Sequence, residues 1–127
     1  MKSFLTEIHT RIIDRFFKPS NAQMLSSAAD QGLDLSQLIP FTFYISFRDS
    51  DDADSVAAML EKRGYKITRE TEEKDPYPFD VEAEIAIFGN EKEIEQQEDF
   101  FRSIARNFPA RYDDYSISYT DEEAVFY

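Results

Sequence analysis

Residues 41–65 read FTFYISFRDSDDADSVAAMLEKRGY, and their pattern indicates the architecture of the whole 127-residue chain. The first eight alternate between apolar and mostly polar side chains, which is the period of a strand with one buried face. Four later apolar residues recur at steps of three and four and predict an amphipathic helix. These residues are Ala53, Val56, Ala57 and Leu60. Gly64 is expected to end the helix, and Tyr65 to open a second strand, so this segment forms a compact strand–helix–strand unit.

A loop, two further strands and one further helix are expected after this unit. Prolines and charged residues mark 70–78 as a loop, and alternating apolar residues predict a strand over 79–88. The helix is expected over 91–108 with Asn90 as its N-cap, and a final strand within 111–119. The resulting order, β-α-β-β-α-β, is typical of the ferredoxin-like fold, an α+β sandwich. Its four-stranded antiparallel sheet carries two helices on one face.

Two additional helices are expected before the sheet. The first is amphipathic and ends at Pro19, and the second begins near Ser20 or Asn21 and ends at Gly32. We therefore divide the chain into an N-terminal amphipathic helix, residues 1–19, and one α+β domain, residues 20–127. The apolar stripe of the first helix is expected to pack on the domain's own core. A homodimer contact and a membrane-surface anchor are the alternatives, and its mixed charges disfavour the anchor.

The composition restricts the classes of partner. The chain has 26 acidic and 14 basic residues and a net charge of −12, so phosphate backbones and anionic lipid surfaces repel it. Direct nucleic-acid binding is not expected, and a basic protein is the natural electrostatic partner. The chain has no cysteine, which excludes disulfides and thiolate metal sites. No apolar run approaches the ~20 residues that span a membrane, so a bacterial cytoplasmic protein is expected.

Residues able to carry chemistry are few. His9 is the single histidine and lacks a cysteine or second histidine to act with it. Four aspartates occur within 49–54, but they lack the glycine and closing glutamate of a calcium loop. Ser50 or Asp51 is instead expected to cap the following helix. We expect no catalytic residue, no metal and no cofactor, and therefore not an enzyme.

An interaction surface is the remaining hypothesis. If both domain helices cover one side of the sheet, the other side is acidic and carries tyrosines. Such a face suits a basic, arginine-rich segment of a partner protein. The side chains expected there are Tyr44, Lys66, Thr68, Glu82, Glu84, Tyr112 and Asp114. The candidate partner-binding residues are Tyr44, Glu82, Glu84, Tyr112, Asp113 and Asp114.

Several segments resemble the RraB family, regulators of ribonuclease activity. They are Leu25–Asp34, which ends in Gln31-Gly32-Leu33-Asp34; Asp52-Ala53-Asp54; Leu60–Ile67; and Arg111–Tyr115. The last is similar to the family's Glu-Tyr-Asp-Gly-Trp segment, although Asp114-Tyr115 stands where the family often has Gly-Trp. The resemblance covers about residues 21–121. It implies a ferredoxin-like, non-catalytic, acidic protein that binds ribonuclease E and inhibits RNA turnover. The alternative function is an immunity protein that neutralises a basic toxin, whose binding surface would have the same chemistry.

Overall fold

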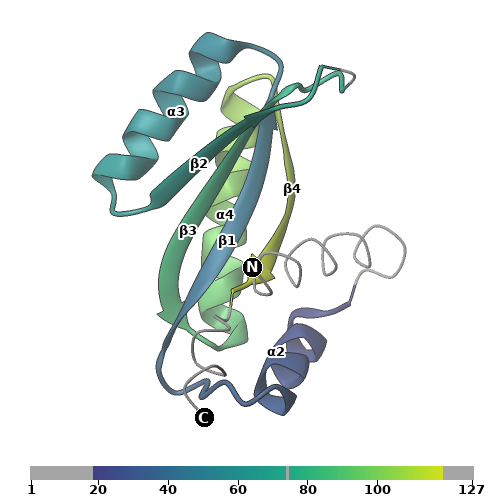
Figure 1. Ribbon diagram of the computed structural model, residues 1–127, viewed down its shortest axis with the longest axis vertical. Coiled ribbons are helices and arrows are strands. Elements are labelled where there is room, and N and C mark those ends of the chain that lie inside the picture. The colour runs from purple at the N-terminus through teal and green to yellow at the C-terminus, as the bar shows by residue number, and fades with distance from the viewer. Residues whose placement is uncertain (1–18, 74, 119–127) are drawn as a thin grey trace.

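The computed structural model describes residues 19–73 and 75–118, which form three helices and a four-stranded antiparallel sheet (Figure 1). The helices are α2 (Asn21–Asp30), α3 (Ser50–Lys62) and α4 (Glu91–Asn107). The strands are β1 (Leu38–Phe47), β2 (Lys66–Thr71), β3 (Phe79–Phe88) and β4 (Ala110–Ile117). From β1 onward the order is the predicted β-α-β-β-α-β. The helix expected over residues 1–19 lies, apart from Pro19, outside the described residues, so the division of the chain at residue 19 stays a prediction.

The sheet has the strand order β2-β3-β1-β4, so β1 and β3 are its central strands. The two pair along their whole length, from Leu38 opposite Phe88 to Phe47 opposite Phe79. β2 pairs with β3 on one edge, and β4 pairs with β1 on the other. Long antiparallel pairing at the centre fixes the register, because a slip of one residue would turn every buried side chain to the other face.

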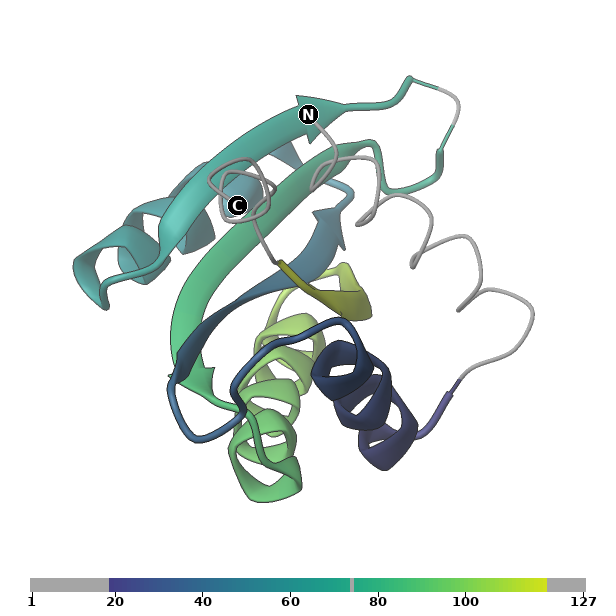
Figure 2. The same cartoon turned by 60° about the horizontal axis from the view of Figure 1, so that its bottom comes forward.

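One buried cluster joins the sheet to α3 and α4. Phe41, Phe43, Ile45 and Phe47 of β1 are fully buried, as their alternation predicts. The apolar stripe of α3 and three residues of α4 join the same cluster. These helix residues are Ala53, Val56, Ala57, Leu60, Ile94, Phe101 and Ile104. Figure 2 shows the sheet curving over α4, with α2 beside that helix.

Local sequence signals determine the helix ends. Asn90 accepts a hydrogen bond from the backbone N–H of Glu93 at 2.9 Å, which confirms it as the N-cap of α4. The predicted cap of α3, Ser50 or Asp51, was wrong. Asp49 is the N-cap and accepts from the N–H of Asp51 at 2.9 Å, because the helix already begins at Ser50. After α3, Gly64 has a φ of +99°, a left-handed conformation that favours glycine.

Candidate functional site

The sheet register brings most of the candidate partner-binding residues together on one side. Tyr44 of β1 lies between Glu82 of β3 and Asp114 of β4. Glu84 stands one position along the same side of β3, opposite Thr42. Because side chains two apart on a strand share a face, these residues lie opposite Phe43 and Ile45 and form a face that does not carry the helix core.

Tyr112 lies on the other side of the sheet, so its predicted placement was wrong. A bulge shifts the register of β4 between Asp114, which pairs with Tyr44, and Tyr112, which pairs with Ile45. The extra residue reverses the alternation, and the Tyr112 ring therefore stacks on Phe101 of α4, with ring centroids 6.1 Å apart.

The bulge keeps Asp113 with the polar face. Its carboxylate accepts a hydrogen bond from Ser46 Oγ at 2.7 Å and another from Arg111 Nε at 2.6 Å. Asp113 and Asp114 therefore both lie near one end of this face, whereas strict alternation would have put them on opposite faces of the sheet. We use the name acidic sheet face for Glu82, Glu84, Asp113 and Asp114.

The centre of this side of the sheet is buried, which sequence reasoning missed. Tyr44 is only 4% exposed, and its hydroxyl is within 2.8 Å of Ser116 Oγ. Thr42 and Ser118 are also buried, and their hydroxyl oxygens lie 3.2 Å apart. The carboxylate residues Glu82, Glu84 and Asp114 are half-buried and Tyr44 is buried. On this side of the sheet, the carboxylate residues therefore keep more exposed surface than the buried Thr42, Tyr44 and Ser118 beside them.

A network of charged side chains extends the polar face toward the loop after β2. Ser46 Oγ lies 2.7 Å from both Asp80 and Asp113, and its single proton is shared between the two carboxylates. Arg111 also pairs with Asp75 at 3.1 Å, and its guanidinium lies 5.1 Å from the centre of the Tyr77 ring.

Arg111 is the cation that holds this network together. Burial alone would lower the pKa of Arg111, but hydrogen bonds and charges from Asp75 and Asp113 raise it overall. The network therefore offsets part of the repulsion between neighbouring carboxylates. The sequence signal that could have found it is the Arg111-Tyr112-Asp113 triplet, because residues two apart on a strand share a face.

A buried carboxylate lies beneath Tyr112. Glu98 of α4 is 6% exposed and accepts a hydrogen bond from the Tyr112 hydroxyl at 2.6 Å, while Arg102 approaches it to 3.7 Å. Burial, followed by the charge of Glu98, raises the pKa of Tyr112 well above its ordinary range. This pair attaches α4 to β4, so Tyr112 acts within the core.

Tyr112→Phe is expected to lower the free energy of unfolding by about 1–3 kcal/mol, because the buried carboxylate of Glu98 loses its closest donor. The measurement is urea denaturation followed by circular dichroism at neutral pH. The matched control is Tyr77→Phe, since the Tyr77 hydroxyl makes no hydrogen bond to residues 19–73 or 75–118. Equal losses in the two variants would contradict the role given to the Glu98 contact.

The pH dependence provides a second readout of the same contact. A tyrosine whose pKa is raised in the folded state contributes fully to the free energy of unfolding below its pKa in the unfolded chain, which is about 10. This contribution is lost as the pH rises further. The stability of the unmodified protein is therefore expected to fall above pH ~10, and that of Tyr112→Phe to fall less steeply.

Within 19–73 and 75–118, no three His, Cys, Asp or Glu side chains are grouped so that they could hold a metal ion. None of the described helices has the length and apolar character required to cross a bilayer. His9 lies outside the described residues.

A protein-family model matches most of the chain. The model of the family described as RraB, regulator of ribonuclease activity B, matches residues 18–116, which is well over half of the chain. No curated protein matches the chain.

Proposed function

Because the chain belongs to the RraB family of regulators of ribonuclease activity, we propose that it binds ribonuclease E in the bacterial cytoplasm and slows RNA cleavage. Members of this family are non-catalytic regulators, which confirms the expectation that the chain is not an enzyme. The observation that carries the proposal is the extent of the family match. It runs from residue 18 to residue 116 and so covers α2 through nearly all of β4.

The proposal includes the ferredoxin-like fold. Its support is the element order β-α-β-β-α-β together with the strand order β2-β3-β1-β4, in which the first and third strands of the chain are central. The inward residues of α3 and α4 join one cluster with β1, which supports two helices on a single face. The opposite face is then the side of the domain that is not covered by α3 or α4.

We place the contact with ribonuclease E on the acidic sheet face. Its four carboxylates lie on β3 and β4, the strands on either side of β1, and all four residues are half-buried. Lysine and arginine side chains of a basic segment would pair with them. Tyr44 lies on this face between Glu82 and Asp114, and its contact with Ser116 ties β1 to β4.

In this proposal the chain acts by contacting the enzyme and not by binding the RNA substrate itself. A chain with a net charge of −12 repels the phosphate backbone, so it has no electrostatic means of holding the substrate. It would instead cover or distort a basic protein segment and neutralise its charge. Binding energy from exposed charges is screened by salt, which gives the proposal a direct test.

The dissociation constant for ribonuclease E is expected to rise about tenfold between ~50 and ~300 mM salt, because exposed charge pairs are screened. Isothermal titration calorimetry with the full chain and purified ribonuclease E measures this constant. A constant that does not change with salt would contradict binding through the acidic face, and absence of binding at every salt concentration would contradict the proposed partner.

A further inference from the structure

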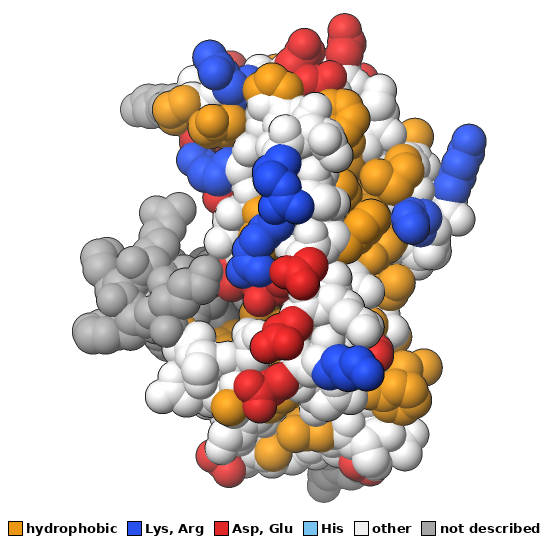
Figure 3. Space-filling view, turned by 180° about the vertical axis from the view of Figure 1, so that it is seen from behind, with side chains coloured by type: hydrophobic (Ala, Val, Ile, Leu, Met, Phe, Trp, Pro, Cys, Tyr) orange, Lys and Arg blue, Asp and Glu red, His pale blue; other side chains and the backbone are white. Residues whose placement is uncertain are grey.

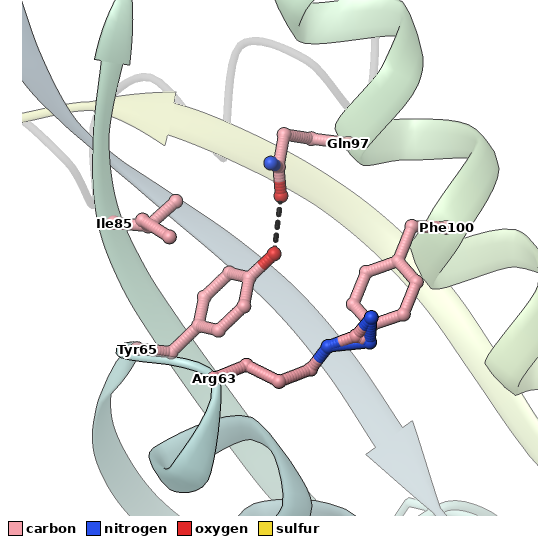
Figure 4. A pocket seen from close by; sticks show the side chains of 5 residues that line it. All are labelled: Arg63, Tyr65, Ile85, Gln97 and Phe100. Carbon is pink, nitrogen blue, oxygen red and sulfur yellow. Dashed lines mark hydrogen bonds between the residues drawn. The ribbon is translucent and has the colours of Figure 1, made fainter.

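A pocket opens on the helix side of the sheet, between the end of α3 and the middle of α4. It has a volume of about 300 Å³ and is lined by Arg63, Tyr65, Ile85, Gln97 and Phe100 (Figure 4). Ile85 is next to Glu84 on β3, and neighbouring residues on a strand point to opposite faces of the sheet. The pocket and the acidic sheet face therefore lie on opposite sides. The two surfaces are therefore separate.

The walls of the pocket are aromatic and aliphatic. The rings of Tyr65 and Phe100 are nearly parallel, 19° apart, with centroids separated by 6.3 Å. The Tyr65 hydroxyl donates to Gln97 Oε1 at 2.5 Å, as the dashed line in Figure 4 shows. This bond fixes the tyrosine and leaves the Gln97 amide N–H groups as the donors of that side chain.

The entrance of the pocket is basic. The Arg63 guanidinium lies 4.7 Å from the centre of the Phe100 ring and makes no ion pair with any side chain in 19–73 or 75–118. Lys62 directly precedes Arg63 at the end of α3. Figure 3, which views the side that carries α4, shows a band of hydrophobic side chains with both basic and acidic side chains beside it. The charge of Arg63, the one charged side chain among the described lining residues, is opposite in sign to the net charge of the whole chain.

We propose that the pocket receives one aromatic side chain from an acidic segment of a partner protein, with a neighbouring carboxylate paired to Arg63. The volume is at the lower limit of the ~300–1,000 Å³ typical of small-molecule sites, so it suits a single side chain. Tyr65, Ile85 and Phe100 provide the apolar contact. Arg63 and Gln97 present only N–H donors, which select an anionic or carbonyl group over a cationic one.

The test uses the full chain labelled with ¹⁵N and a short peptide, acetyl-Glu-Phe-Glu-amide, at ~150 mM salt so that long-range repulsion is screened. We expect saturable shifts of the backbone signals of Tyr65, Ile85 and Gln97. The peptide with alanine in place of phenylalanine, and the peptide with lysine in place of both glutamates, are expected to bind at least about fivefold more weakly. No saturable shift, or equal binding of the lysine peptide, would overturn the proposal.

A pair of variants tests the role of Arg63. Arg63→Glu is expected to weaken the acidic peptide about tenfold, because an attractive charge becomes repulsive. Arg106→Glu makes the same change of charge at an exposed position of α4 away from the pocket, and is expected to change the affinity less than about twofold. If both variants weaken binding equally, the effect is one of net charge and the assignment of the pocket is wrong. Circular dichroism of both variants verifies that they are folded.

Discussion

Replacing Phe43 with alanine is expected to lower the free energy of unfolding by about 3–5 kcal/mol. The side chain is fully buried at the middle of the central strand β1. Its ring lies 5.1 Å from that of Phe101 on α4 and 5.8 Å from that of Tyr115 on β4, between centroids. The variant would therefore leave a cavity where the sheet meets α4, and the pairing of β1 with β3 and β4 limits how far the sheet can move to close it.

The control for this change is Phe88→Ala, at the end of β3. Phe88 is 48% exposed, so its replacement is expected to cost less than about 1 kcal/mol. Urea denaturation monitored by circular dichroism gives both values, provided that the denaturant slopes of the variants agree. Comparable losses for the two variants would show that the Phe43 cluster is not the core of the domain.

Reversing two charges on the acidic sheet face is expected to weaken binding to ribonuclease E at least about tenfold. The variant is Glu82→Lys together with Glu84→Lys, which turns two carboxylates on the proposed contact into ammonium groups. Like charges facing each other across an interface cost free energy, and the loss is therefore larger than that from neutralising the same residues. Isothermal titration calorimetry provides the dissociation constants.

The matched control has the same change of net charge on the helix side. Glu61 on α3 and Glu95 on α4 are both exposed, and Glu61→Lys with Glu95→Lys is expected to change the affinity less than about threefold. Equal losses for the two double variants would mean that ribonuclease E senses the net charge of the chain. In that case the location of the contact on the acidic sheet face would be wrong.

The sequence was sufficient for most of the fold because its periodic signals are strong. Alternation in residues 41–47 and in 79–88 predicted both central strands, and the steps of three and four in 53–60 predicted the buried stripe of α3. Gly64 and Asn90 marked helix ends through chemistry local to the backbone. Each of these signals depends only on residues near one another in the chain.

The site was less predictable because its decisive features come from pairing between distant segments. The bulge in β4 reversed the side on which Tyr112 lies, and nothing in the alternation of residues 111–119 marks an extra residue. The hydroxyl of the buried Tyr44 has its partner, Ser116, in β4, 72 positions away in the chain. Glu98 did carry a signal, since it lies four residues after Ile94 and three before Phe101, within the apolar stripe.

The most direct measurement of the central claim is the rate at which purified ribonuclease E cleaves a fluorescent RNA as this protein is added. We predict a saturable decrease with the unmodified chain, little decrease with Glu82→Lys/Glu84→Lys, and no cleavage by the chain alone. An unchanged cleavage rate at saturating concentrations of the unmodified chain would contradict the account.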